Sequence, residues 1–561
     1  MKFQNLKALL LFIVLVVAFT WPLTPHMATH YPSTLWYEGG DPNLYISVMN
    51  LVAQKAANWH FHPSQMIYYP AGMNFLAGYE APLIFVVSTP VILVSHNPIL
   101  AYNIILLLAF VLTCYAAYAL IRYLTKSYFA ALIAGGSFGL SPYMMVRGTQ
   151  HLDLLLLFCV PFSILLGFKF VENPNCRNAI LLALSVLIAS LTAWYYLLGI
   201  LIFLGLLFLF NIRKAEPYKK QYLFAMILVF FAVAIPALPM FIYRNPDSFK
   251  YVSYLVDTRG ADPLNFFIPH PYMQPWTGNI YNYFISPYEA TSYYGIIGII
   301  AILVLVLMRR RIVIPYRRLW ITTIILFIVI AMGNYFSAFH HQIKLPFYYL
   351  SRFLPFDRLR APNRFFIFSY LGVTVVFGYF LAYMRNWFQK ISGLAMFTIP
   401  LLALLCAERM IIPYPVIQLS VPKFYMDIGQ DNSNYAIADI PFVDPGLSIY
   451  NFYQIYHKKP IADGEYFWTA YNYDTFDFAR SNALLVNSVP TLNDIRPPAP
   501  VDAKLALKQL AYANIKYVVV HNLILHADKD EALTAFIHNF FRDQKSVYAD
   551  GAITVYSTSP E

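Results

Sequence analysis

Apolar stretches of about 20 residues recur along this chain, and each is long enough for an α-helix to cross a lipid bilayer. Hydrophobic residues make up 59% of the 561 residues and charged residues only 12%, against about 25% in soluble domains. The sequence therefore predicts an all-α polytopic membrane domain with about eleven transmembrane helices. The predicted spans cover roughly residues 8–23, 99–121, 128–145, 151–171, 178–194, 196–210, 222–243, 293–308, 319–335, 364–384 and 391–412.

The positions of lysine and arginine predict how these spans are oriented. Basic clusters lie between apolar stretches, at residues 2–7, 122–126, 213–220, 309–318 and 385–390. All of them fall in the cytoplasm, as the positive-inside rule requires, if the N-terminus is cytoplasmic and residues 81–95 do not cross the membrane. Pro82 and Pro90 interrupt that stretch, so we expect a re-entrant or interfacial helix there. The net charge of +11 is thereby explained by membrane orientation, and no nucleic-acid partner is expected.

This orientation predicts a multi-pass protein of the bacterial inner membrane. Residues 1–412 form the transmembrane domain, and the first segment is read as an uncleaved span. Extracytoplasmic segments are predicted at 24–98, 244–292 and 336–363. Residues 413–561 form an α/β domain in the periplasm or outside the cell, with a helix at 502–513, a strand at 515–521 and a hairpin at 546–557. Asp550-Gly551 supplies the hairpin turn.

The first extracytoplasmic segment contains the acids of greatest chemical interest. Asp41 directly precedes an amphipathic helix predicted at 43–57, and an acid at this position can act as a general base or bind a cation. The alternative is a helix cap, because Asp41 followed by Pro42 is a favourable helix start. Glu80, before the proline-interrupted helix, is the second candidate catalytic residue and can orient an acceptor or bind a cation.

The sequence from Gly39 to Phe75, GGDPNLYISVMNLVAQKAANWHFHPSQMIYYPAGMNF, with GYEAPL after it, resembles the first periplasmic loop of the GT-C superfamily of membrane glycosyltransferases. Protein O-mannosyltransferases and lipid A aminoarabinose transferases are members of that superfamily. Further blocks resemble a bacterial branch of it: SPYMMVRGTQHLDLL (141–155), YEATSYYGIIGI (288–299), LPFDRLRAPNRFFIF (354–368), IKYVVVHN and VYADGAITVYST. The resemblance implies a GT-C-like fold, a catalytic or substrate-positioning carboxylate at Asp41, and a polyprenyl-phosphate sugar as donor. Pro42 and Asn43 stand where those enzymes carry a second acid.

Several basic residues fall on the extracytoplasmic side, where positive charge is normally depleted. Because arginine binds phosphate through a planar set of donors, these residues are candidates for the donor phosphate site: Arg147, Arg358, Arg360 and Arg364. They could instead bind ordinary lipid headgroups or pair with Asp153 and Asp357. Other candidates for substrate binding are Asn43, Tyr45, His151, Asp153 and Glu289. His151 and Asp153 flank the start of a span, where ionisable groups are costly, and Glu289 could equally be a helix-start acid.

Together these features predict an inverting membrane glycosyltransferase. Its partners are a polyprenyl-phosphate-linked sugar, membrane lipids, and an acceptor glycan, lipid or protein outside the cytoplasm. No phosphate-binding loop and no metal-ligand spacing among the four cysteines is found, so no cofactor is required, although a divalent cation could bind. Two alternatives remain: a lipid or glycan transporter or flippase, and a non-catalytic cell-envelope assembly factor on the same scaffold.

Overall fold

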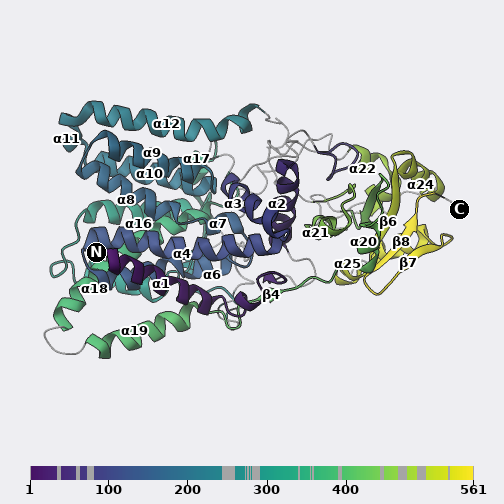
Figure 1. Cartoon of the computed structure of the whole chain (residues 1–561). Helices are drawn as coiled ribbons and strands as arrows, with labels where there is room; N and C mark the ends of the chain where they lie inside the picture. The colour runs from purple at the N-terminus through teal and green to yellow at the C-terminus, as the bar shows by residue number, and fades with distance from the viewer. Residues whose placement is uncertain are drawn as a thin grey trace.

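The architecture comes from a computed structural model of the chain. It describes residues 2–34, 40–57, 64–72, 81–242, 260–271, 273, 277, 280, 291–338, 341–353, 356, 359–388, 394–442, 448–464, 477–488, 501–528 and 531–559. A bundle of apolar helices occupies one end of the molecule and a small β-sheet the other, with α2 (Asp41–Ala57) between them (Figure 1).

The helical bundle is built from the apolar stretches. Its helices are α1 (Lys2–Phe19), α3 (Pro82–Ser95), α4 (Pro98–Thr125), α5 (Tyr128–Gly139), α6 (Pro142–Arg147), α7 (Leu152–Leu155), α8 (Cys159–Glu172), α9 (Cys176–Ser190), α10 (Trp194–Phe210), α11 (Ile212–Ala215), α12 (Lys219–Ile242), α15 (Gly295–Val306), α16 (Arg317–Ala331), α18 (Phe366–Phe388) and α19 (Leu394–Arg409). Short polar caps set several of their starts. The side chains of Asn97, Ser127 and Asn175 accept backbone N–H groups at the first turns of α4, α5 and α9.

Five helical segments in the described part of the chain are long and apolar enough to cross a membrane: 98–125, 128–147, 152–172, 212–239 and 362–385. Each overlaps a predicted span. Shorter apolar helices of 10–17 residues lie at 3–19, 82–95, 176–190, 194–210 and 295–306. The chain is therefore a mostly helical membrane protein, while the count of about eleven spans stays a prediction. Residues 82–95 do form a short helix, and whether it crosses the membrane also stays a prediction.

Close packing of α4 on α5 shows how small residues build this bundle. A Cβ atom added at Gly135 would lie 2.7 Å from the Cα of Tyr118, and one at Gly139 would lie 2.4 Å from the sulfur of Cys114. Both glycines therefore let the two backbones approach closely, as small residues commonly do between membrane helices.

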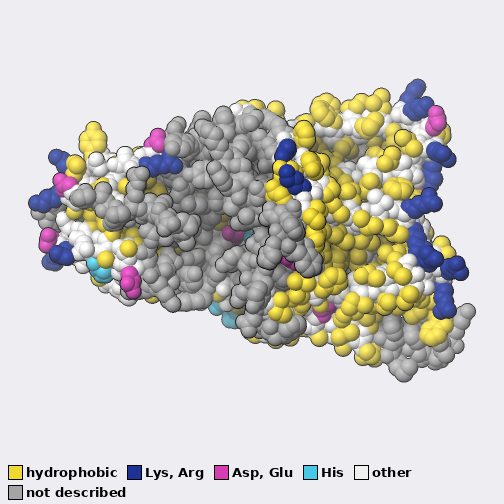
Figure 2. All heavy atoms as spheres, turned by 180° about the vertical axis from the view of Figure 1, so that it is seen from behind, with side chains coloured by type: hydrophobic (Ala, Val, Ile, Leu, Met, Phe, Trp, Pro, Cys, Tyr) yellow, Lys and Arg dark blue, Asp and Glu magenta, His cyan; other side chains and the backbone are white. Residues whose placement is uncertain are grey.

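The outer surface matches a membrane location. On the face seen in Figure 2, hydrophobic side chains form a broad band over the bundle, and Lys and Arg side chains lie along the end of the bundle away from the sheet. Exposed residues in the basic loops include Arg213, Lys214, Lys219, Lys220 and Arg309 to Arg311.

The sheet region follows the bundle in the chain. Its four strands have the order β5 (Ala436–Ile440), β6 (Ile515–His521), β8 (Ile553–Ser557) and β7 (Ser546–Ala549). Strands β5 and β6 are parallel, with Ala438 opposite Val518, and the other two pairs are antiparallel. The helices around the sheet are α20 (Lys423–Ile428), α21 (Ser448–His457), α22 (Asp477–Ser481), α23 (Ala483–Asn487), α24 (Ala503–Tyr512), α25 (Asn522–Asp528) and α26 (Glu531–Phe540). The helix predicted at 502–513, the strand at 515–521 and the hairpin at 546–557 are confirmed.

Segments from the first loop join the bundle to the sheet region. Strand β1 (Tyr31–Pro32) pairs with β4 (Val416–Ile417), and the backbones of Met66 and Ile461 are hydrogen-bonded at 2.9 Å. Helix α2 packs on α21, α3 and α4. The predicted helix at 43–57 is thus present, and it is held between the membrane helices and the sheet region.

Candidate functional site

Asp41 opens α2 and faces a residue far away in the chain. The Oδ2 atom of Asp41 lies 3.2 Å from Nε2 of His151, and the two side chains are 41% and 17% exposed. Gly40, at φ 59°, precedes Asp41, and its carbonyl accepts hydrogen bonds from the Asn43 N–H and the Ser448 hydroxyl, both at 3.0 Å. The carboxyl of Asp41 is therefore fixed by its neighbours and still open to solvent on one side.

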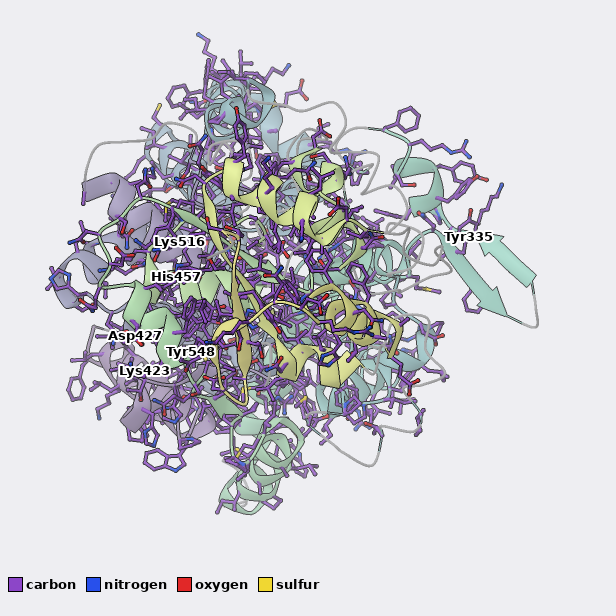
Figure 3. All side chains as sticks on the ribbon, turned by 90° about the vertical axis from the view of Figure 1, so that its right-hand side faces the viewer. Tyr335, Lys423, Asp427, His457, Lys516 and Tyr548 are labelled. Atoms are coloured by element: carbon purple, nitrogen blue, oxygen red, sulfur yellow. The ribbon has the colours of Figure 1, made fainter. Side chains whose placement is uncertain are left out.

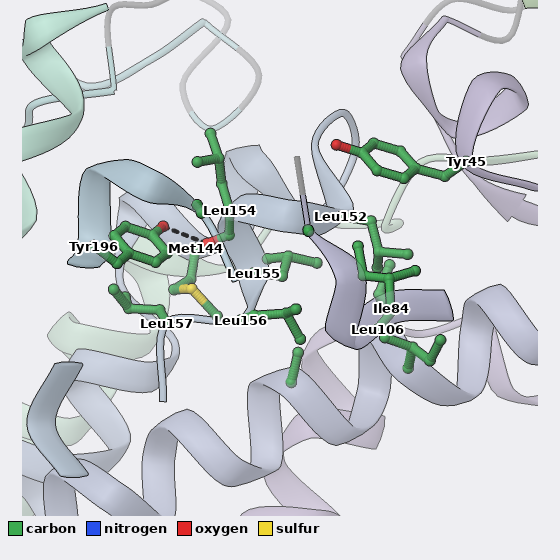
Figure 4. Packing of buried hydrophobic residues seen from close by; sticks show 14 of the residues in the cluster. Tyr45, Ile84, Leu106, Met144, Leu152, Leu154, Leu155, Leu156, Leu157 and Tyr196 are labelled. Atoms are coloured by element: carbon green, nitrogen blue, oxygen red, sulfur yellow. Dashed lines mark hydrogen bonds between the residues drawn. The ribbon is translucent and has the colours of Figure 1, made fainter. Parts of the chain in front are cut away.

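A second contact ties the same two segments together. Tyr45 lies one helical turn after Asp41, and its hydroxyl donates to Oδ1 of Asp153 at 2.6 Å. Tyr45 and Asp153 are both buried. Figure 4 shows Tyr45 extending from α2 above the segment at 152–157. The structure thus brings together Asp41, Tyr45, His151 and Asp153, all of which the sequence analysis selected.

Asn43 lies on the buried side of α2. It has no exposed surface, and its side-chain oxygen accepts a hydrogen bond from the Tyr31 hydroxyl. This contact links α2 to β1. Asn43 therefore supports the placement of α2, and its predicted substrate contact stays a prediction.

Arg147 is buried one turn before His151. The His151 N–H donates to the Arg147 carbonyl at 2.9 Å. Arg147 therefore lies in the same turn as His151, the residue that contacts Asp41. Arg147 has no exposed surface; its Nη2 donates to the Thr291 hydroxyl at 3.2 Å, and its guanidinium lies 5.6 Å from the Tyr143 ring centroid.

The charge of Arg147 also acts on a buried histidine. Burial and, to a smaller extent, the nearby positive charge of Arg147 together lower the pKa of His270 to about 3. His270 is therefore neutral near pH 7, and it can donate or accept a hydrogen bond without adding charge. The guanidinium of Arg147 is thus a buried positive group on the residue one turn before His151.

The later arginines form a second neighbourhood. Arg364 is 6% exposed in the short helix η8 (Pro362–Phe365), and its guanidinium lies 5.0 Å from the centroid of the Tyr195 ring. The Tyr195 hydroxyl accepts the Ala361 N–H at 2.9 Å. Arg360 is half-buried just before it.

Tyr195 and Tyr196 connect the two neighbourhoods. The Tyr196 hydroxyl donates to the carbonyl of Leu154, the residue after Asp153, as the dashed line in Figure 4 shows. Its neighbour Tyr195 supports Arg364. The sequence analysis did not include this tandem among the candidate site residues, and its contacts with both candidate groups were not foreseen.

Three predicted site residues, Glu80, Arg358 and Glu289, lie outside the described residues. Their proposed roles stay predictions. Among the described residues, no group of three or more His, Cys, Asp and Glu side chains is arranged to hold a metal ion.

A buried ion pair that sequence reasoning missed lies against the start of α15. Oε2 of Glu408 lies 3.1 Å from Nη1 of Arg409, with the side chains 8% and 2% exposed. Oε1 of Glu408 accepts the Ile296 N–H at 2.9 Å. A Cβ added at Gly295, where φ is +62°, would lie 1.9 Å from that oxygen, so the carboxyl fits only against glycine.

The Glu408 carboxyl therefore contacts the start of α15 at Gly295 and Ile296, a few residues after the Thr291 partner of Arg147. The missed signal was two adjacent charges inside an apolar stretch, a placement costly enough to mark a functional or structural site.

Comparison with solved structures concerns the fold of the chain. Arabinofuranosyltransferase AftD from Mycobacteria, in the mutant R1389S class 1 structure, matches at a TM-score of 0.57 and 13% identity, covering 99% of this chain and 41% of that one. The class 2 structure of the same mutant matches at 0.55 and 12%, covering 99% and 42%. ArnT from Cupriavidus metallidurans bound to undecaprenyl phosphate matches at 0.44 and 11%, covering 98% of each chain. This chain thus spans about two fifths of the AftD chain.

The protein is therefore a membrane protein with a GT-C-like fold, as the resemblance implied. It belongs to the family described as "Domain of unknown function (DUF6311)", which matches residues 10–407. Among curated proteins, none matches the sequence.

Proposed function

We propose that this protein is a membrane glycosyltransferase that moves a sugar from a polyprenyl-phosphate donor to an acceptor outside the cytoplasm. The observation that carries the proposal is the turn at residues 147–153. It holds His151 against Asp41, Asp153 against Tyr45, and the buried cation of Arg147 one turn away. A solvent-accessible carboxyl, together with a buried guanidinium on the residue one turn before its histidine partner, suits a reaction in which a hydroxyl attacks while a phosphate departs. The GT-C-like fold supports the same class of enzyme.

In the proposed reaction the acceptor oxygen attacks the anomeric carbon of the donor. The bond from that carbon to the acceptor oxygen forms as its bond to the phosphate oxygen breaks, so the configuration inverts. Asp41 accepts or orients the hydroxyl proton, with His151 holding the carboxyl in place. The departing phosphate takes the electron pair, and Arg147 and Arg364 stabilise its growing negative charge, with Arg358 and Arg360 as further candidates.

The orientation is part of the proposal. We place the first loop and the domain at 413–561 outside the cytoplasm of a bacterial inner membrane, with the N-terminus inside. The basic residues at the end of the bundle away from the sheet support this orientation (Figure 2). A nucleotide sugar is not available on the outer side, so a transferase there needs a membrane-borne donor. Glu80, Glu289, Asn43 and Tyr45 keep their proposed roles in acceptor or substrate binding.

The test compares glycans and glycolipids by mass spectrometry in cells that carry the gene, lack it, or carry Asp41→Asn. We expect Asp41→Asn to give the products of the strain lacking the gene while the protein accumulates normally. The matched control is Asp427→Asn, which removes an exposed acid paired with Lys423 in the sheet region and should leave the products unchanged. Normal products with Asp41→Asn would instead indicate a non-catalytic scaffold or a transporter.

A further inference from the structure

A short hairpin and the helix after it form an unusual surface beside the bundle. Strand β2 (Tyr335–Ala338) pairs with β3 (His341–Lys344), with Tyr335 opposite Lys344, and α17 (Pro346–Leu350) follows. Figure 3 shows this hairpin, labelled at Tyr335, projecting from the rest of the molecule. The name hairpin patch is used here for Ile343, Lys344, Tyr348, Tyr349, Leu350, Arg352 and Phe353.

Two cations of the hairpin patch are held on one tyrosine. Lys344 Nζ lies 4.6 Å and the Arg352 guanidinium 4.5 Å from the centroid of the Tyr348 ring. Arg352 Nη2 also donates a hydrogen bond to the Tyr348 hydroxyl. A hydrogen bond with Lys344 and the charges of both cations hold the pKa of Tyr348 below its usual value. The centroid of the Tyr335 ring lies 5.3 Å from that of the Tyr348 ring, so the two cations lie on a pair of packed aromatic rings.

Neither cation is paired with an acid among the residues that the structure describes. Within the part of the chain that the structure describes, the ion pairs involve other residues, and none includes Lys344 or Arg352. Two positive charges on one ring repel each other, and an anion close to both would remove that repulsion. The hairpin patch is therefore complementary to a negatively charged group.

Large apolar side chains surround these cations and face outward. Phe353 is 67% exposed, and Ile343 and Tyr349 are each 56% exposed. Helix α17 lies at the end of the bundle nearer the sheet (Figure 1), and Figure 2 shows a small group of Lys and Arg side chains where the hydrophobic band ends on that side. Exposed apolar groups beside basic ones at such a boundary are typical of elements that lie in a membrane interface.

We propose that the hairpin patch binds the headgroup of an anionic phospholipid, with Lys344 and Arg352 contacting its phosphate and Ile343, Tyr349 and Phe353 inserting among the acyl chains. The cations match the charge of the headgroup, and the apolar side chains match the layer below it. This inference is independent of the proposed glycosyl transfer, because none of these residues belongs to the Asp41 and Arg147 site.

The test titrates the purified full-length protein, in a neutral detergent, with phosphatidylglycerol and counts bound lipid by native mass spectrometry. The double variant Lys344→Gln, Arg352→Gln should raise the half-saturating lipid concentration of its tightest site by about 25-fold at low salt. Each basic residue near an anionic surface contributes about 1 kcal/mol, which is about a fivefold factor. Phe353→Gln should weaken the same binding with both cations kept. The unaltered protein and the variants should bind phosphatidylcholine, which has no net charge, with similar half-saturating concentrations.

The matched control removes two exposed lysines of α24 with Lys504→Gln, Lys508→Gln, which lowers the net charge by the same amount away from the bundle. We expect this control to bind phosphatidylglycerol as the unaltered protein does. Equal binding by the hairpin and control variants would overturn the proposal. Inorganic phosphate that displaces no lipid supports the proposal, whereas inorganic phosphate that binds the hairpin patch equally well would assign it to a free anion instead.

Discussion

The hydrogen bond from Tyr45 to Asp153 gives a sharp test of how α2 is attached to the bundle. Tyr45→Phe removes only the hydroxyl and leaves the buried carboxyl of Asp153 without that donor. Leaving a buried polar group unsatisfied costs about 1–3 kcal/mol. The expected loss in the free energy of unfolding is therefore about 2 kcal/mol.

Tyr102 of α4 provides the matched control for this substitution. It is fully buried near Asp41 and Asp153, and its hydroxyl has no hydrogen-bond partner within the part of the chain that the structure describes. Tyr102→Phe removes the same atom, and we expect a neutral or stabilising effect, because a buried hydroxyl without a partner contributes no bond in the folded state.

The assay is thermal unfolding of the detergent-purified proteins, followed by intrinsic fluorescence. A loss of 1 kcal/mol lowers the midpoint by about 2–4 °C in a domain of 150–250 residues and by less in a longer chain. We expect a decrease of about 2–4 °C for Tyr45→Phe and none for Tyr102→Phe. Equal midpoints for the two variants would refute the reasoning, because they would mean that the contact between α2 and α7 contributes nothing to stability.

Two further predictions concern buried charge. Arg409→Met should destabilise the protein by about 3–5 kcal/mol because it leaves Glu408 buried without its partner, whereas Glu408→Gln combined with Arg409→Met should recover much of that loss in the same thermal assay. Equal losses for the single and double variants would contradict this. For His457, burial lowers the pKa to about 4, with Lys459 adding to the decrease and Asp439 opposing it. The unfolded state, with a pKa near 6.5, then binds a proton first, so stability is full above pH 6.5 and falls by about 3 kcal/mol as the pH decreases from 6.5 to 4. His457→Gln should flatten this part of the stability profile, and an unchanged profile would show that the pKa of His457 is the same in the folded and unfolded states.

Much of the fold could be predicted from local pattern. The start of α2 at Asp41-Pro42, the strand at 515–521 and the Asp550-Gly551 turn each depend on neighbouring residues, and all three are present. The number of spans is harder to predict, because α9 and α15 contain 15 and 12 residues and their apolar character alone does not decide whether they cross the membrane.

The candidate site could be predicted as a set of residues but not as pairs. Sequence selected Asp41, Tyr45, His151 and Asp153 separately, while the pairing of residues 108 or more positions apart depends on tertiary packing. From sequence, the alternative role for Arg147 was an ion pair with Asp153, which lies six positions later in the chain. In the structure the Asp153 carboxyl accepts from Tyr45 and Arg147 donates to Thr291, because α2 and the segment at 291–296 pack against the same turn.

The proposed function requires that Asp41 faces the outside of the cytoplasmic membrane. Gln65→Cys places an exposed thiol in the first loop, and Lys214→Cys places one in a basic loop at the other end of the bundle. Cys176 and Cys406 are replaced by serine in both variants, and Cys114 and Cys159 are buried. A membrane-impermeant thiol reagent should label Gln65→Cys in intact spheroplasts and Lys214→Cys only after lysis. Labelling of Lys214→Cys in intact spheroplasts, with Gln65→Cys protected until lysis, would put the candidate site in the cytoplasm and contradict the proposed function.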